Sequence, residues 1–312
     1  MTNGPQRDVF WNRVYDFARR DPDIVIVSAD MGAPSLDRFR RDMPTQFVNV
    51  GIAEQNAIML ATGLVLTGKK VFTYAIAPFI TLRCLEQIRV ESAIMKAPIT
   101  IVGVGAGFGY DDSGPTHHMV EDIAIMRAMP HIRIDSISDG VMAAYFAEIS
   151  CAGDKTVTNY VRLDRLDEAV IYPEDADFSK GLLLSKEKGD TCLIATGSMT
   201  HTALAIADAL APKGIHVGVM DVFSFPVNAP EFLEKIKRFN KVITLEEHLL
   251  AGGLGSAVLE VLNDYGAYIP VHRLGIAPEM GYCYKYGGRE VIRQYYGLDK
   301  KSLLRKISKL VP

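Results

Sequence analysis

The sequence predicts an α/β fold with two domains, each a mainly parallel sheet flanked by helices. The chain has 312 residues, 48% of them hydrophobic and 23% charged, which is enough to bury a large core and suits two domains better than one. Short apolar runs rich in Val and Ile alternate with helical segments, as in a parallel sheet covered on both faces. A polar connector, residues 164–190, separates two blocks of this alternation. We therefore predict domains at residues 1–178 and 179–312.

The first block contains a helical opening and several short apolar strands. The strands are predicted at residues 23–30, 98–109, 131–137 and 159–163. A long helical stretch is expected over residues 82–95 and a second helix over residues 140–152. Before both of these, residues 47–74 read as a strand that turns directly into a helix rich in Ala, Leu and Met. This order is typical of one α/β domain.

The second block repeats strand and helix three times after the connector, in which one hairpin or short strand is expected. The predicted strands cover residues 191–198, 216–222, 241–247 and 270–276. The predicted helices cover residues 199–214, 230–239, 252–266 and 302–310. About 120 residues in this order make a domain of ordinary size.

Composition and charge exclude several classes of protein. The formal net charge of −3 provides no basic field for nucleic acid. Residues 1–20 lack the apolar core of a signal peptide, and we find no apolar run long enough to cross a bilayer. The four cysteines, Cys84, Cys151, Cys192 and Cys283, have no metal-binding spacing and are expected to be reduced. We therefore expect a cytoplasmic protein without a nucleic-acid or membrane partner.

Two glycine-rich segments suggest nucleotide or anion binding only superficially. The glycines of residues 103–109 fall at every second position, which is not the G-x-G-x-x-G spacing of a dinucleotide site. Residues 251–257 open a helix and could either hold an anion or permit close packing. The loop at residues 109–122 follows a strand and carries adjacent histidines, which we interpret as hydrogen-bond donors or proton shuttles, with His117 favoured over His118.

Glu54 raises a question because it opens a strongly apolar helix. A carboxylate near a helix N-terminus can be a simple solvated cap, favoured by free N–H groups. Here apolar residues lie on nearly every face of the helix, which predicts burial on more than one side. A buried carboxylate needs a hydrogen-bond partner or a proton.

Three motifs, "GIAEQNA", "GPTHH" and "EEHLLAGGLGSAV", resemble the transketolase family of thiamine-diphosphate enzymes, in particular its pyrimidine-binding and C-terminal domains. The likeness runs from about Arg7 to the end of the chain. The 1-deoxyxylulose-5-phosphate synthases share the first motif, and the β subunits of 2-oxoacid dehydrogenases are more distantly similar.

The resemblance assigns the cofactor to a few residues. It implies that Glu54 hydrogen-bonds the pyrimidine nitrogen of thiamine diphosphate and that Phe79 stacks on this ring. Ile52, in the same motif as Glu54, is expected to line the cofactor site. Tyr74 either contributes to the pocket wall or is a core aromatic.

The resemblance also suggests substrate-binding residues. His117 matches a histidine that faces the substrate. Residues that match or lie near the sugar-phosphate site are Ser35, Arg165, Asp112, Ser113 and, less directly, Arg7 and Arg162. A structural salt bridge is an equally good interpretation of Arg162. The chain departs from the family at Ser113, where an aspartate is usual, and at Gly105–Ala106, where a histidine or arginine is usual, so its substrate could differ from the common sugar phosphates.

The chain lacks the G-D-G motif that holds Mg²⁺ and the cofactor's diphosphate in this family, and we predict no metal site in it. The resemblance therefore implies a large partner subunit that holds Mg²⁺, an α2β2 heterotetramer, and transfer of a two-carbon ketol unit from a ketose to an aldehyde. Three alternatives stay open: a synthase- or dehydrogenase-type subunit, a noncatalytic assembly subunit, and a fragment of a single-chain enzyme.

Overall fold

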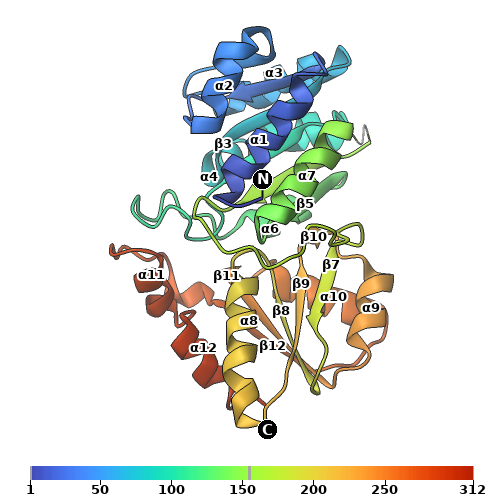
Figure 1. Ribbon diagram of the computed structural model, residues 1–312, viewed down its shortest axis with the longest axis vertical. Coiled ribbons are helices and arrows are strands. Elements are labelled where there is room, and N and C mark those ends of the chain that lie inside the picture. The colour runs from blue at the N-terminus through green and yellow to red at the C-terminus, as the bar shows by residue number, and fades with distance from the viewer. Residues whose placement is uncertain (1, 154–155, 312) are drawn as a thin grey trace.

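The computed structural model describes residues 2–153 and 156–311, which form two domains stacked along the long axis of the molecule (Figure 1). The first domain carries the N-terminus and contains a seven-stranded sheet. The second contains a five-stranded sheet and carries the C-terminal helices. Both are mainly parallel α/β layers, which confirms the predicted fold class.

The first sheet has the strand order β10-β5-β6-β4-β3-β1-β2. Its strands are β1 (Ile24–Ser28), β2 (Phe47–Asn49), β3 (Lys70–Ile76), β4 (Thr100–Val104), β5 (Ile132–Ser136), β6 (Thr158–Leu163) and β10 (Ser224–Phe225). All pairs are parallel except β10 with β5. The edge strand β10 comes from the second half of the chain, so the second domain completes the sheet of the first.

Helices cover both faces of this sheet. The helices are α1 (Gln6–Ala18), α2 (Pro34–Asp42), α3 (Glu54–Leu66), α4 (Ala77–Ile80), α5 (Leu85–Gln87), α6 (Asp122–Arg127) and α7 (Gly140–Ala152), with a short 3₁₀ turn, Pro44–Gln46. On one face, Trp11 of α1 and Phe146 of α7 join a core with Phe72 and Val102 of the sheet. On the other face, Ala57 and other residues of α3 pack against the opposite side chains of the same strands.

The helix expected over residues 82–95 is a prediction that the structure corrects. A turn follows α4, and α5 then passes into a π-helical segment, Ile88–Ile94. The wider π-helical turn changes the direction of the side chains, so the simple α-helical period does not describe this stretch. Helix α7, in contrast, begins at the expected residue, because Asp139 accepts a hydrogen bond from the backbone N–H of Met142.

The second sheet has the order β12-β11-β8-β9-β7, with only β7 antiparallel to its neighbour. Its strands are β7 (Leu182–Lys186), β8 (Thr191–Ala195), β9 (Gly218–Val222), β11 (Lys241–Leu249) and β12 (Val271–Ile276). Its helices are α8 (Met199–Leu210), α9 (Ala229–Ile236), α10 (Leu254–Asp264), α11 (Arg289–Tyr296) and α12 (Lys300–Ile307), with 3₁₀ turns Ala211–Lys213 and Pro278–Met280. Helix α11 and strand β10 are absent from the sequence-based prediction. The boundary at residues 178 and 179 stays a prediction; it falls between the end of β6 and the start of β7.

A buried ion-pair network joins the two domains. Arg289, at the start of α11, donates hydrogen bonds to Asp164 of the first domain over 2.6 Å and to Glu247 of the second over 2.7 Å. Glu247 also accepts a hydrogen bond of 3.2 Å from the backbone N–H of Phe108. Burial opposes ionisation of Glu247, but the charges of Arg289 and Arg293 outweigh it and hold its pKa well below the usual range. The two domains therefore meet through charged groups that hydrogen-bond to one another.

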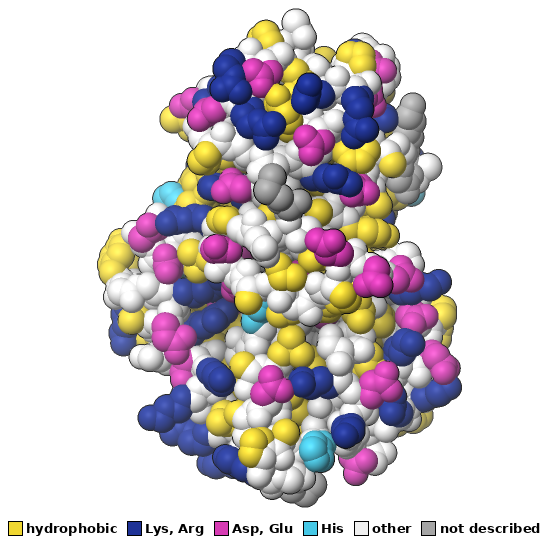
Figure 2. All heavy atoms as spheres, in the orientation of Figure 1, with side chains coloured by type: hydrophobic (Ala, Val, Ile, Leu, Met, Phe, Trp, Pro, Cys, Tyr) yellow, Lys and Arg dark blue, Asp and Glu magenta, His cyan; other side chains and the backbone are white. Residues whose placement is uncertain are grey.

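The surface mixes both signs of charge. Figure 2 shows Lys and Arg side chains interspersed with Asp and Glu over the first domain, with a denser group of basic side chains low on the second. Within residues 2–153 and 156–311, none of the helices has the length and apolar character needed to span a bilayer.

Candidate active site

Glu54 is a buried carboxylate at the first position of α3. The chain leaves β2, makes a left-handed turn at Gly51 (φ 74°) and enters the helix at Glu54, which is 3% exposed. The guanidinium of Arg83 donates a hydrogen bond of 2.6 Å to Oε2 of Glu54. Arg83 is thus the partner that a buried carboxylate at this position requires.

Phe79 lies beside this ion pair. It follows the carboxyl end of β3 within the short helix α4, where ligands commonly bind in parallel sheets. The guanidinium carbon of Arg83 is 4.5 Å from the centroid of the Phe79 ring. One planar group, the guanidinium, therefore contacts both the carboxylate and the aromatic ring. Arg83 lies in the turn between α4 and α5 and was not predicted from the sequence, where the available signal was a cation four residues after Phe79.

His117 lies next to Phe79, so that Glu54, Phe79 and His117 form a row. Its ring lies 5.1 Å from Phe79 and 6.1 Å from Tyr110, measured between ring centroids. Its Nδ1 is 3.0 Å from Oγ1 of Thr116. His118 instead packs against Phe108 in the interior, where burial lowers the pKa of its imidazole. Of the two adjacent histidines, His117 is the one that stands beside Phe79.

Tyr110 explains why the chain has a glycine at position 105, in the segment where the transketolase family usually has a histidine or arginine. A Cβ atom at Gly105 would lie 2.2 Å from Cδ2 of Tyr110, so the tyrosine ring occupies the space that a side chain at position 105 would need. Gly105 also has φ 91°, which favours glycine. Tyr110 is itself largely buried, and burial raises the pKa of its phenol.

Polar groups surround Tyr110. The guanidinium carbon of Arg165 is 4.7 Å from the Tyr110 ring centroid, and Arg165 donates two hydrogen bonds of 3.1 Å to Asp112. These hydrogen bonds, with one from Ser113, lower the pKa of Asp112 to about 2. Ser113 donates its own hydrogen bond to Asp112 over 2.9 Å. Arg165, Asp112 and Ser113 therefore form one exposed cluster at the end of the row.

A second polar cluster lies at the start of the chain. Arg7 and Asp8 form an ion pair of 2.9 Å, and the hydroxyl of Ser35 donates to Asp8 over 3.4 Å. Burial raises the pKa of Tyr110, and the charges of Arg165 and Arg7 oppose that rise, so Arg7 lies near enough to act on the phenol. Of the predicted polar residues, Arg165 contacts Tyr110 directly, and Arg7 acts on it through its charge.

Family models match nearly the whole chain. "Transketolase, pyrimidine binding domain" matches residues 6–186, and "Transketolase, C-terminal domain" matches residues 180–303. The chain belongs to the transketolase family. This confirms the resemblance that the three sequence motifs suggested.

The similar proteins include subunits of split transketolases. The chain is 34% identical to a subunit of the apulose-4-phosphate transketolase of Phocaeicola vulgatus, over 96% of this chain and 95% of that protein. It is 32% identical to a 6-deoxy-6-sulfo-D-fructose transketolase subunit of Clostridium sp. (strain MSTE9), over 96% and 92%. A solved structure of a "Split gene transketolase, inactive beta4 tetramer" superimposes with a TM-score of 0.85, at 28% identity and 98% coverage of both chains.

The residues at Glu54 fit the pyrimidine ring of the cofactor that transketolases use. The guanidinium of Arg83 is planar, hydrogen-bonds the Glu54 carboxylate and lies on the Phe79 ring. An aminopyrimidine has the same planarity and can make the same two contacts. For a metal the outcome differs: in the part of the chain that the structure describes, no group of three or more His, Cys, Asp or Glu side chains could hold an ion.

Two of the residues expected to bind ligands have structural surroundings instead. Tyr74 is fully buried in β3, with its ring 5.1 Å from that of Trp11, so it belongs to the core of the first domain. Arg162 is also buried and donates a hydrogen bond of 2.7 Å to Asp122, which supports the salt-bridge interpretation over a phosphate site. These surroundings favour the core aromatic for Tyr74 and the salt bridge for Arg162, the alternatives given above, and their binding roles stay predictions. Ile52, in contrast, is 79% exposed just before Glu54 and is free to contact a ligand or another chain.

The glycine segments have structural roles as well. The N-terminus of α10, where an anion was one possibility, is occupied by the protein's own Glu246, whose carboxylate accepts hydrogen bonds from Leu254 N (2.7 Å) and Gly255 N (3.0 Å). Gly107 lets the backbone approach Glu247, because a Cβ atom there would lie 2.3 Å from its Oε2.

A tyrosine-rich segment of the second domain, residues 281–289, lies against the loop that carries His117. Tyr282 donates its phenol hydrogen to Glu121 over 2.7 Å, and the backbone N–H of Arg289 donates to Asp111 over 2.7 Å. The hydroxyl of Tyr286 lies close to Gly114. The C-terminal domain therefore supports the His117 loop in this transketolase chain.

Proposed function

We propose that this chain is the small subunit of a two-subunit, thiamine-diphosphate-dependent transketolase. The enzyme would transfer a two-carbon ketol unit from a ketose to an aldehyde. The observation that carries this proposal is the row formed by Glu54, Phe79 and His117, assembled from three separate segments of a transketolase-family chain. A noncatalytic assembly subunit would have no need to keep these three groups together.

The roles of the residues follow from their positions. Glu54 accepts a hydrogen bond from the pyrimidine ring or shares its proton, and Phe79 supports the face of that ring. When bound, the cofactor supplies the carbon nucleophile for ketol transfer. His117 stands beside Phe79 and donates a hydrogen bond to substrate oxygen atoms that gain negative charge. These groups supply the pyrimidine half of an active site.

The substrate is proposed to be a ketose with an anionic end group. Arg165 on Tyr110 and the cluster of Arg7 and Ser35 offer charged and hydroxyl donors, with Asp112 and Ser113 available for sugar hydroxyls. The named substrates of the two similar subunits carry a phosphate and a sulfonate, respectively. Both are anions that an arginine fork can bind.

An exposed apolar surface supports the proposal of a partner subunit. It comprises Met59 and Leu66 of α3, which are seven residues apart and so lie on one side of the helix, and Ile52, two residues before the helix begins. The adjoining segment adds Leu82, Val90, Ile94 and Met95. The other sides of α3 are buried or half-buried, as expected for a helix covered on more than one side, and only the side that carries Met59 and Leu66 is open. Such a surface is typical of protein interfaces.

We propose that the large subunit covers this surface and brings the Mg²⁺ and diphosphate site, giving an α2β2 heterotetramer. The similar β chain that was solved as an inactive tetramer fits this division of labour. We also propose a cytoplasmic location, supported by four cysteines that are all free and buried.

A direct test is to purify this chain from its native cells under mild conditions and identify co-purifying chains and bound thiamine diphosphate. Recovery of a similar-sized chain with a G-D-G motif, together with cofactor and ketol transfer from a phosphorylated ketose, is the expected result. A chain that purifies alone and stays inactive with every candidate large subunit would refute the proposal.

Met59→Glu is expected to prevent assembly, because it places a charge at the centre of the apolar surface on α3. Binding to the large subunit, measured by interferometry, should weaken at least roughly 100-fold. The matched control is Leu259→Glu, which changes a comparably exposed leucine on α10 in the second domain. Equal affinities for both variants would show that α3 is not the interface.

Arg83→Met is expected to strengthen binding of thiamine to the assembled enzyme by roughly threefold to tenfold. Arg83 occupies both contacts of the ring, on Glu54 and on Phe79, and must release them before the ring can bind. Calorimetric titration with thiamine reports the affinity without turnover. Arg89→Met, in the neighbouring π-helical segment, is the control. Weaker binding in Arg83→Met would mean that Arg83 helps to hold the cofactor.

A further inference from the structure

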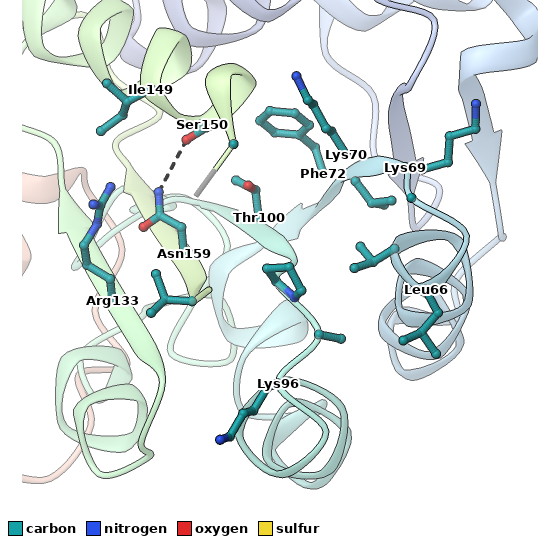
Figure 3. A pocket seen from close by; sticks show the side chains of 17 residues that line it. Leu66, Lys69, Lys70, Phe72, Lys96, Thr100, Arg133, Ile149, Ser150 and Asn159 are labelled. Atoms are coloured by element: carbon teal, nitrogen blue, oxygen red, sulfur yellow. Dashed lines mark hydrogen bonds between the residues drawn. The ribbon is translucent and has the colours of Figure 1, made fainter. Parts of the chain in front are cut away.

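A basic cavity of about 330 Å³ lies in the first domain, away from the row at Glu54 (Figure 3). It is formed where β3, β4, β5 and β6 begin, between the end of α3 and the end of α7. The candidate active-site residues follow the opposite, carboxyl ends of β2, β3 and β4. Because β3 has seven residues, the two ends of the sheet are about 20 Å apart. The cavity is therefore a separate site.

Cations dominate the polar lining of this cavity. Lys69, Lys70, Lys96 and Arg133 contribute to its wall, and none of the described residues of the lining is acidic. Three of these cations pair with carboxylates outside the lining: Lys69 with Asp23, Lys70 with Asp21, and Arg133 with Asp135.

Lys96 has no ion-pair partner among the described residues, and it has a left-handed backbone (φ 58°). Among the described residues, three of the four lining cations are thus paired with carboxylates, and the charge of Lys96 is not neutralised by an ion pair. This charge selects for an anion.

The cavity also contains a buried polar atom without a partner. Asn159, 7% exposed at the start of β6, donates its amide to the hydroxyl of Ser150 over 3.4 Å, while its Oδ1 has no hydrogen-bond partner. Figure 3 shows Asn159 between Ser150 and Arg133, with Lys69, Lys70 and Phe72 across the cavity. A buried acceptor left unpaired is costly, so a ligand that donates a hydrogen bond there would be stabilised.

The remaining walls are apolar. Phe72, Val71, Val157 and Ile149 line the cavity together with Ala97 and Pro98. Its volume is at the lower end of the range for small-molecule sites. The walls thus suit a compact organic body more than a bare inorganic ion.

We propose that this cavity binds a small organic anion, with a phosphate or carboxylate group held by the lysines, an apolar body against Phe72, and a hydroxyl donor directed at Asn159. Such a ligand would stabilise the first domain from the side of the sheet opposite the active site. The proposal does not depend on the proposed enzymatic activity, because it rests on the walls of the cavity alone.

The test is calorimetric titration of the purified full-length chain with 2-hydroxyphenyl phosphate. This compound combines an anionic group, an apolar body and a hydroxyl donor. Binding of one molecule per chain is expected, and phenyl phosphate, catechol and inorganic phosphate should each bind at least roughly threefold more weakly, because each lacks at least one feature.

Lys96→Met should weaken binding of 2-hydroxyphenyl phosphate by roughly tenfold, and Thr100→Phe, which fills the cavity, should abolish it. Lys213→Met, a surface lysine of the second domain, is the control and should bind like the parent chain. Melting curves must show that the variants are folded. The proposal is overturned if the parent does not bind with saturation, or if folded Lys96→Met and Thr100→Phe bind as tightly as the control.

Discussion

Glu54→Gln is expected to lower kcat/KM of the assembled enzyme by roughly 10²-fold to 10⁴-fold, the range for loss of a group that moves a proton. Glutamine keeps the size of the side chain, but its amide cannot take up and release a proton. It also loses the charged contact with Arg83. The measurement is steady-state ketol transfer with saturating cofactor and large subunit.

Binding of thiamine to Glu54→Gln gives a second readout, since the loss of the carboxylate should also weaken the complex with the ring. Glu86→Gln is the matched control, because Glu86 is an acid in the nearby helix α5 that no hydrogen bond joins to the row. Activity of Glu54→Gln within about threefold of the parent would favour the noncatalytic assembly subunit.

Arg289→Met is expected to destabilise the chain by about 3–5 kcal/mol, the usual cost of removing one partner from a buried ion pair. Arg289 is 7% exposed and bonds Asp164 and Glu247 at the junction of the domains. Without it, Asp164 loses its cation, and Glu247 keeps only Arg293 and the N–H of Phe108. Urea unfolding followed by circular dichroism gives the difference in stability.

The control for this prediction is Arg305→Met on α12, which removes an exposed arginine from the same domain and should change stability by less than about 0.5 kcal/mol. A loss for Arg289→Met no larger than that of the control would mean that the junction does not depend on its charges. Separate unfolding transitions for the two domains in Arg289→Met would support its role as their link.

Much of the fold could be predicted because buried parallel strands have a strong local signal. The run around Ile26 is apolar throughout, and all five residues of β1 are buried. The signal failed where a structure depends on distant partners. Residues Ser224–Phe225 are too few to predict a strand, and they form β10 only because β5 offers them an open edge. The π-helical segment failed for a different reason, since it violates the period used to predict helices.

In the candidate site, too, residues with a local sequence signal could be predicted, whereas residues that act through distant contacts could not. Glu54, Phe79 and His117 stand in motifs, so the sequence indicates them directly. Arg83 and Tyr110 are single residues whose importance lies in what they touch across the fold. The apolar character of α3 indicated that its faces need cover, but a sequence pattern does not tell whether the cover is the same chain or another one.

The strand β10 has a consequence for protein engineering. Because the second half of the chain supplies an edge strand to the sheet of the first, the two domains are not independent modules. A chimera that joins this first domain to the C-terminal domain of a relative would have to match the hydrogen bond between Ser224 and Asp135 as well as the contacts of Arg289. Proteolytic cleavage within the connector should likewise leave the two fragments associated. The practical unit for recombination is therefore the whole chain.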